Sequence, residues 1–267
     1  MNDGHIHTPY CPHGSSEPLK SYVERAISHG YTSITFTEHA PLPEKFIDPV
    51  PDQDSAMKTE DVEDYIREIT QLKKTFSNEI DIRLGFEVDY INGYERDTED
   101  FLNHYGPYMD DSILSVHFLK PQKQWYCIDF SADMFKMAME DAGSIHNLYQ
   151  LYFDTLEKSA LADLGNHKPL RIGHMTLIKK FQLLYDPPAD WHNRAASFLD
   201  IVKKQGMTLD YNGAGTQKEY CLESYPPQTI ARLASSKGIQ LIYGSDAHHP
   251  AGLNQGLDKI EQSLITR

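Results

Sequence analysis

Near the start of the chain, Asp3-Gly4-His5-Ile6-His7-Thr8 has the composition of a short strand with polar residues at its end. Side chains alternate between the two faces of a strand, so His5 and His7 project to the same side. Two imidazoles on one side of a strand could bind one metal ion. A lone pair of this kind is weak evidence, and its meaning depends on what the other strands carry.

Short β-branched or aromatic segments alternate with amphipathic segments along the rest of the chain. Strands are predicted at residues 4–7, 33–37, 82–88, 113–117, 170–174, 208–212 and 239–244. Helices are predicted at residues 19–28, 59–76, 145–162, 193–205, 227–236 and 253–264. This alternation is typical of an α/β protein with a parallel sheet and right-handed crossovers.

The positions of the polar residues favour a closed barrel over an open sheet. Glu87, His117 and His174 each end a predicted strand, as do His7 and Asn212. A (β/α) barrel builds its site at the carboxyl ends of all its strands, whereas an open sheet concentrates it at one switch point. We therefore expect a closed barrel of about seven such units, in a single domain over residues 1–267. Segments 41–58 and 119–143 show no clear period and are expected to be loops over the site.

Composition restricts the kinds of partner. The formal net charge is −14, which disfavours nucleic-acid binding but leaves room for a small phosphorylated substrate. No run of eighteen apolar residues indicates a membrane span. The N-terminal residues lack the basic and apolar regions of a signal peptide, and three cysteines without CxxC spacing favour reduced thiols, so a cytoplasmic protein is expected. No sequence feature indicates an oligomeric state.

Nine residues at or just beyond strand ends form a candidate metal-binding set. They are His5, His7, His13, His39, Glu87, His117, His174, Asp246 and His248. Burying so many polar groups on one rim without partners would be costly, whereas metal binding would satisfy them together. A mixture of imidazole and carboxylate suits zinc, iron or manganese better than calcium or magnesium.

Three stretches resemble the PHP (polymerase and histidinol phosphatase) family, and in particular its histidinol-phosphate phosphatase branch. They are Asp3 to Thr8 with Cys11-Pro12-His13, Gly173-His174-Met175-Thr176-Leu177-Ile178-Lys179-Lys180-Phe181, and Gly244-Ser245-Asp246-Ala247-His248. The resemblance covers essentially the whole chain. It implies an α/β fold of the PHP type, a distorted (β/α)7 TIM-like barrel that holds three metal ions.

The resemblance also assigns the ligands. It implies a first metal bound by His5, His7, Glu87 and Asp246. Glu87 would bridge to a second metal, completed by His117 and His174. A third would be bound by His13, His39 and His248. The activity implied is hydrolysis of L-histidinol phosphate to L-histidinol and phosphate, a step of histidine biosynthesis.

For the mechanism, we expect a metal-bridging hydroxide to attack phosphorus, because paired metals activate water and clamp phosphoryl oxygens. Asp246 or His248 could transfer a proton as a catalytic residue. Lys180, or its neighbour Lys179, could contact the phosphate, and Asn212 could orient the substrate. Aromatic residues in the predicted loops could stack on the substrate ring; they are Trp125, Tyr126 and Phe130.

Other interpretations share much of this pattern. A phosphoesterase acting on a different small phosphate ester would have the same metal ligands, and only substrate profiling separates the two. A metal-binding module without turnover is a second alternative, disfavoured by the complete ligand set. An amidohydrolase also uses two histidines on a barrel strand, but the sequence offers no convincing bridging lysine, and His13 and His39 would have no role.

Overall fold

The computed structural model describes residues 1–266 and contains a sheet of seven parallel strands. Along the sheet the strands are β1 (Asn2–Ile6), β2 (Ser33–His39), β3 (Asp81–Asp89), β4 (Ile113–Ser115), β7 (Arg171–Ile172), β8 (Thr208–Asn212) and β9 (Leu241–Gly244). The segment after β9 returns to β1, where the His7 amide donates to the Ala247 carbonyl at 3.0 Å and the Asp246 amide donates to the His5 carbonyl at 2.8 Å. These bonds nearly close the barrel, as the sequence predicted.

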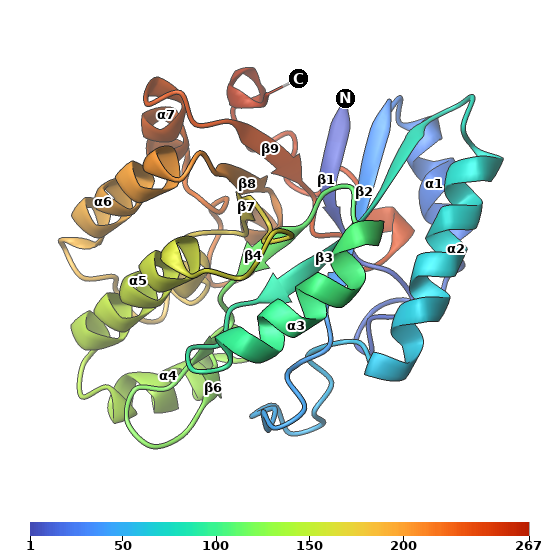
Figure 1. Ribbon diagram of the computed structural model, residues 1–267. Helices are drawn as coiled ribbons and strands as arrows, with labels where there is room; N and C mark the ends of the chain where they lie inside the picture. The colour runs from blue at the N-terminus through green and yellow to red at the C-terminus, as the bar shows by residue number, and fades with distance from the viewer. Residues whose placement is uncertain (267) are drawn as a thin grey trace.

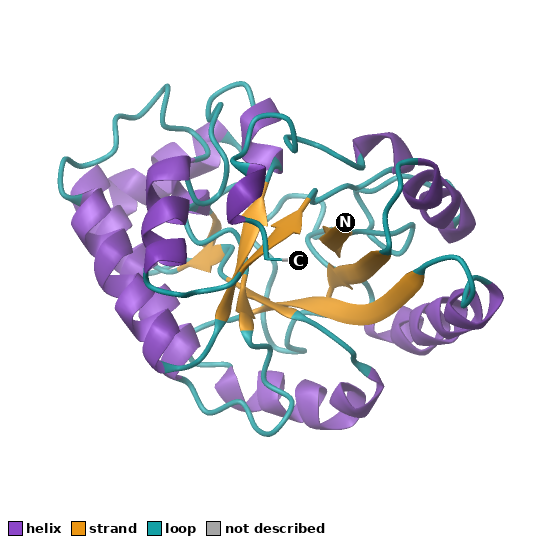
Figure 2. Ribbon diagram, turned by 90° about the horizontal axis from the view of Figure 1, so that it is seen from above, coloured by secondary structure: helices purple, strands orange, loops and turns teal. Residues whose placement is uncertain are grey.

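Helices surround the strands (Figures 1 and 2). The α-helices are α1 (Leu19–Ser28), α2 (Val62–Thr75), α3 (Glu95–Tyr105), α4 (Ala132–Asp141), α5 (Ile145–Leu161), α6 (Trp191–Lys204) and α7 (Gln228–Ser236). The 3-10 helices are η1 (Thr59–Asp61), η2 (Gly106–Tyr108), η3 (Leu177–Lys179), η4 (Ala214–Gln217), η5 (Pro250–Gly252) and η6 (Gln262–Leu264). A small antiparallel pair, β5 (Phe118–Leu119) and β6 (Tyr126–Cys127), lies outside the barrel sheet. None of the helices in residues 1–266 is long and apolar enough to cross a membrane.

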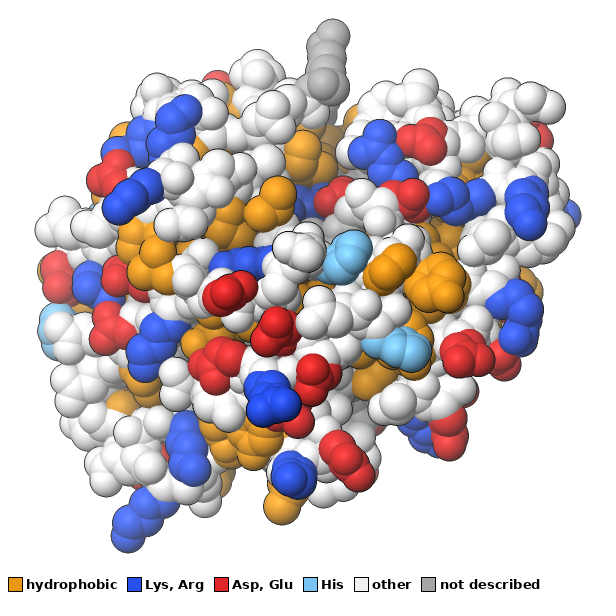
Figure 3. Space-filling view, viewed as in Figure 1, with side chains coloured by type: hydrophobic (Ala, Val, Ile, Leu, Met, Phe, Trp, Pro, Cys, Tyr) orange, Lys and Arg blue, Asp and Glu red, His pale blue; other side chains and the backbone are white. Residues whose placement is uncertain are grey.

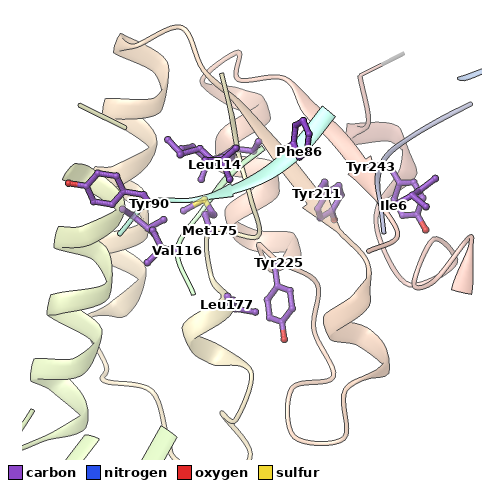
Figure 4. Packing of buried hydrophobic residues seen from close by; sticks show 14 of the residues in the cluster. Ile6, Phe86, Tyr90, Leu114, Val116, Met175, Leu177, Tyr211, Tyr225 and Tyr243 are labelled. Atoms are coloured by element: carbon purple, nitrogen blue, oxygen red, sulfur yellow. The ribbon is translucent and has the colours of Figure 1, made fainter. Parts of the chain in front are cut away.

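Strand β2 has an apolar face and a polar face, and from Ile34 to His39 both are buried. On β2, Ile34 and Phe36 belong to the hydrophobic core, whereas Thr35, Thr37 and His39 alternate with them. The apolar side chains pack in the layer between strands and helices, part of which is shown in Figure 4. The polar side chains therefore face the barrel interior, and their last members reach the site.

The helix predictions were right in part. Helices α1, α2, α5, α6 and α7 lie where a helical period was predicted, with ends shifted by a few residues. Helix α3 was missed, and α4 lies inside segment 119–143, which we expected to be a loop. The signal for α4 was local: the Ser131 hydroxyl caps the helix by accepting from the Met134 amide, and only Phe135 and Ala138 form its buried face.

The helix predicted at residues 253–264 is wrong. The segment forms turns and ends in η6. Gly256 has φ +70°, and a Cβ there would lie 2.2 Å from the Gly213 carbonyl oxygen. This close approach to the end of β8 requires glycine and is incompatible with a helix. Contacts between segments distant in the sequence thus overrode the local helical period.

Gly85 lies two residues before Glu87 on β3. Glycine is required there because the backbone at Asp111 passes very close to it. A Cβ at this position would lie 1.6 Å from the backbone oxygen of Asp111. We predict that Gly85→Ala lowers the free energy of unfolding by about 1–3 kcal/mol, because the strand or the crossing backbone must move. Urea unfolding followed by circular dichroism measures this change. The partly exposed neighbour Arg83→Ala is the control and should change stability by about 0.5 kcal/mol or less; equal effects would contradict the prediction.

Candidate metal centre

The candidate ligands meet at the carboxyl ends of the strands, and four of them form a first cluster. His5 Nε2 lies 3.1 Å from His7 Nε2 and 3.4 Å from Glu87 Oε2. His7 Nε2 lies 3.3 Å from Asp246 Oδ1. One metal ion with bonds of about 2.0–2.2 Å needs donor atoms at such separations. These four residues therefore fit the first predicted metal.

Glu87 also faces a second cluster through its other oxygen. Glu87 Oε1 lies 2.7 Å from His174 Nε2 and 3.8 Å from His117 Nε2, and it accepts a hydrogen bond of 2.6 Å from the Ser115 hydroxyl. Because Oε2 faces His5 and Oε1 faces His174, this carboxylate is positioned to bridge two ions. The geometry agrees with the bridging role that the family resemblance implied.

A third group of histidines lies nearer the solvent. The ring centroid of His13 lies 5.5 Å from that of His39 and 5.1 Å from that of His248. His39 Nδ1 is buried and lies 3.1 Å from Glu87 Oε2, which links this group to the first cluster. Donor atoms of His7, Cys11, His39 and His248 also lie within 4.8 Å of one another. Burial raises the pKa of the Cys11 thiol, which keeps it protonated in the absence of metal.

Three buried carboxylates orient the histidines. Asp210 lies 2.8 Å from His5 Nδ1, Glu38 3.1 Å from His7 Nδ1, and Asp89 2.8 Å from His117 Nδ1. A proton on each Nδ1 leaves Nε2 with a lone pair directed at the clusters. Carboxylates that accept a hydrogen bond from metal-binding histidines are the usual second layer of a metal site. Sequence analysis missed these carboxylates, because an acidic residue within a strand cannot be distinguished by spacing from one that faces solvent.

The charges of the clusters compensate one another. Burial disfavours ionisation of Glu87, but the surrounding imidazoles of His5, His39 and His117 hold its pKa well below its usual range. Burial also opposes protonation of His7, yet its hydrogen bonds to Asp246 and Glu38 raise its pKa to about 9. For His248, burial and the charge of His7 lower the pKa to about 3. Protons bound to imidazoles such as His7 thus stabilise the metal-free clusters. Metal ions that bind to the same nitrogen atoms would displace these protons.

Above the clusters lies a cavity with two lobes, of about 400 and 250 Å³. The larger lobe is walled by the metal ligands and by Leu177, Tyr225 and Lys218; Leu177 and Tyr225 are visible together in Figure 4. On the face shown in Figure 3, acidic and basic side chains are interspersed, so the negative net charge is not gathered into one patch there. The lobes are large enough for a small phosphate ester.

Of the two predicted lysines, Lys180 faces the cavity. Its Nζ donates to the Asp129 carbonyl at 2.6 Å and lies 3.1 Å from Asp129 Oδ2, and both residues line the two lobes. Lys179 is buried elsewhere, 2.5 Å from Glu223 Oε2 and over the Trp191 ring. Lys180 is therefore the lysine in reach of a phosphate.

Asn212 is fully buried beside the first cluster. Its Nδ2 donates to Asp210 Oδ2 at 3.1 Å and to Asp246 Oδ2 at 3.2 Å, and its Oδ1 accepts from the Ala214 amide. These bonds use the hydrogen-bonding groups of its amide. The geometry favours a role in orienting Asp246 over the direct substrate contact that we predicted.

The aromatic residues of the loops divide into two groups. Trp125 packs against Phe46 in a small hydrophobic cluster with Val50 and Phe118, and it lines neither lobe. Phe130 lines the smaller lobe, together with Phe118, which sequence analysis did not single out. Phe118 directly follows the strand predicted at residues 113–117, and nothing in its sequence context marks it as part of a separate short strand, β5.

The chain belongs to the PHP domain family, because the PHP domain model matches residues 3–214. The histidinol-phosphatase of Bacillus subtilis is 46% identical over 248 residues, which cover 92% of each chain. A Listeria monocytogenes protein assigned as a histidinol phosphatase has a crystal structure that matches with a TM-score of 0.93 and 36% identity, over 97% of this chain and 99% of that one.

A more distant structure shares the fold. Histidinol phosphate phosphatase from Lactococcus lactis, complexed with zinc, L-histidinol and phosphate, matches with a TM-score of 0.67 over 99% of this chain and 94% of that one. The two sequences are 16% identical over this match. The barrel architecture is therefore maintained while most of the sequence differs.

Asp210 allows a test of the second layer of the site. We predict that Asp210→Asn lowers zinc affinity by about 10–100-fold, because the His5 ring loses the carboxylate that fixes its tautomer. Competition with a chromophoric chelator measures the affinity. The matched control is Asp200→Asn, an exposed aspartate on α6 that pairs with Lys237. A zinc affinity unchanged by Asp210→Asn would show that this carboxylate does not support the site.

Proposed function

We propose that this protein is a metal-dependent phosphatase that hydrolyses L-histidinol phosphate to L-histidinol and phosphate. The observation that carries the proposal is the convergence of nine candidate metal ligands, seven of which line a cavity of about 400 Å³. The identity of 46% to a histidinol-phosphatase over nearly the whole chain supports the substrate. The reaction would supply histidinol to histidine biosynthesis.

We also propose that the site holds three ions, drawn from zinc, iron and manganese. His5, His7, Glu87 and Asp246 would hold the first; Glu87, His117 and His174 the second; His13, His39 and His248 the third. When bound, such ions lower the pKa of water and neutralise phosphate charge. Imidazole donors, which supply at least half of each set, favour these metals over magnesium and calcium.

The remaining residues would bind and orient. Lys180 is the cation that would meet the phosphate, because its ammonium lies on the cavity wall and is held by Asp129. Asp246 or His248 would handle the proton of the leaving alcohol. Both line the cavity, and His248 Nδ1 lies 3.1 Å from the Asp246 carbonyl oxygen, which fixes its ring.

A cytoplasmic location fits this proposed biosynthetic role. Cys11, Cys127 and Cys221 are buried and free, and none of them forms a disulfide in residues 1–266. Reduced, unpaired thiols are typical of proteins in a reducing compartment.

Phosphate release from L-histidinol phosphate tests the proposal. The metal-loaded protein is compared with a chelator-treated sample, on this substrate and on a panel of nucleotides and sugar phosphates. We expect chelator-sensitive turnover with a strong preference for histidinol phosphate. Glu87→Gln should lower kcat by more than about 100-fold, since it removes a bridging carboxylate and second-layer changes alone cost 10–100-fold. The exposed Glu79→Gln is the control.

The possible results separate the alternatives. Activity spread evenly over the panel would support the proposed metal-dependent phosphatase activity but would contradict the proposed specificity for histidinol phosphate. A protein that binds metal but releases no phosphate from any ester would support a non-catalytic metal-binding module instead.

A further inference from the structure

The two lobes of the cavity adjoin, because five residues line both of them: His13, His39, His117, Asp129 and Lys180. The three histidines belong to the candidate ligand sets. The other two form an ion pair that is about one-fifth exposed. A substrate whose phosphate meets the candidate metal centre and whose other end enters the smaller lobe would therefore lie beside this pair.

Asp129 has hydrogen-bonding capacity left for a ligand. Lys180 donates to its carbonyl oxygen and to Oδ2. Within residues 1–266, the donor recorded for Oδ1 is the Cys127 thiol, at 3.3 Å. A thiol is a weak donor, so a stronger one can take its place. Burial opposes ionisation of Asp129, but the Lys180 ammonium overcomes this and holds the carboxyl pKa below its usual range.

The smaller lobe has the walls of a ring-binding site. Val50, Phe118 and Phe130 line it, and Phe130 is 47% exposed at its edge. Phe118 and Val50 are held in place by the cluster that includes Phe46 and Trp125. A preformed apolar slot with flat aromatic walls suits a planar ring of small size.

The other carboxylates on the cavity have different partners. Glu87 and Asp246 belong to the metal clusters, and Asp89 holds His117. Asp54 lines the smaller lobe but not the larger one. In the larger lobe, Lys218 would repel a cationic group. Among the described residues, Asp129 is thus the carboxylate that lines both lobes without belonging to a candidate metal-ligand set.

We infer that Asp129 determines specificity by binding the ammonium group of an amino-alcohol phosphate, while the lobe walled by Val50, Phe118 and Phe130 receives the ring. This inference rests on the proposed function and names the residues that would determine the substrate specificity of the enzyme. In histidinol phosphate the ammonium sits on the carbon next to the ester-bearing carbon, and the imidazole lies farther from phosphorus. The order of groups along the substrate therefore matches the order metal centre, Asp129, apolar lobe.

Two substrates that differ by one amino group test the role of Asp129. L-Histidinol phosphate is compared with 3-(imidazol-4-yl)propyl phosphate, which lacks the ammonium group. We expect the wild type to prefer the amino substrate in kcat/KM by roughly 10–100-fold, the range of a hydrogen bond to a charged group. Asp129→Asn should bring this ratio close to one. Because the ratio compares two substrates on one protein, a general loss of folding or metal cancels.

Asp54→Asn is the matched control, since Asp54 lies on the wall of the same lobe. It should keep the wild-type ratio. A ratio that survives Asp129→Asn, or that collapses in Asp54→Asn instead, would overturn the inference. If the wild type releases no phosphate, the proposed function fails. Calorimetry then gives the dissociation constants of L-histidinol and its desamino counterpart. The ratio of these two constants replaces the ratio of kcat/KM values, and Asp129→Asn should likewise bring it close to one.

The ring lobe has its own test. Phe130→Ala should lower kcat/KM for histidinol phosphate roughly threefold to tenfold, because the ring loses an aromatic contact. The same variant should leave kcat/KM nearly unchanged for 2-aminopropyl phosphate, which has the ammonium group but lacks the ring. Equal losses on both substrates would place the ring outside this lobe.

Discussion

The structure depends on the compensation of charge around one buried carboxylate. Glu87 is 1% exposed, and its two oxygens face two different groups of imidazoles. An isolated carboxylate in such a place would be strongly destabilised, and removing its partners one at a time would leave unpaired charges inside the barrel. The histidines that compensate this charge are also the candidate metal ligands. Stability and chemistry therefore rest on the same side chains.

This arrangement explains why the barrel differs from one filled with branched aliphatic residues. The outward faces of its strands supply the hydrophobic core, and the inward faces carry Thr35, Thr37, Asp210 and the ligands. An interior of this kind needs hydrogen bonds in place of close apolar packing. The second-layer carboxylates provide them for the histidine rings, so the polar interior orients the site as well as filling the barrel.

The sequence allowed the barrel, its seven strands and the convergence of the ligands to be predicted, because period-two strands and strand-end histidines are local signals. It did not allow prediction of features created by distant contacts. The approach of Gly256 to Gly213 removed a predicted helix. The pairing of Asp210 with His5 spans 205 residues, and no local pattern marks it. Likewise, only the packing around Phe118 shows that this residue lines the smaller lobe of the cavity.

The closure of the barrel between β1 and the segment after β9 sets the order of events during synthesis. His5 and His7 are synthesised more than two hundred residues before Asp246 and His248. Until then the early histidines have no carboxylate from the far edge of the sheet, and the first cluster lacks one of its candidate donors. A nascent chain would thus carry an incomplete candidate site until both edges of the sheet have been made.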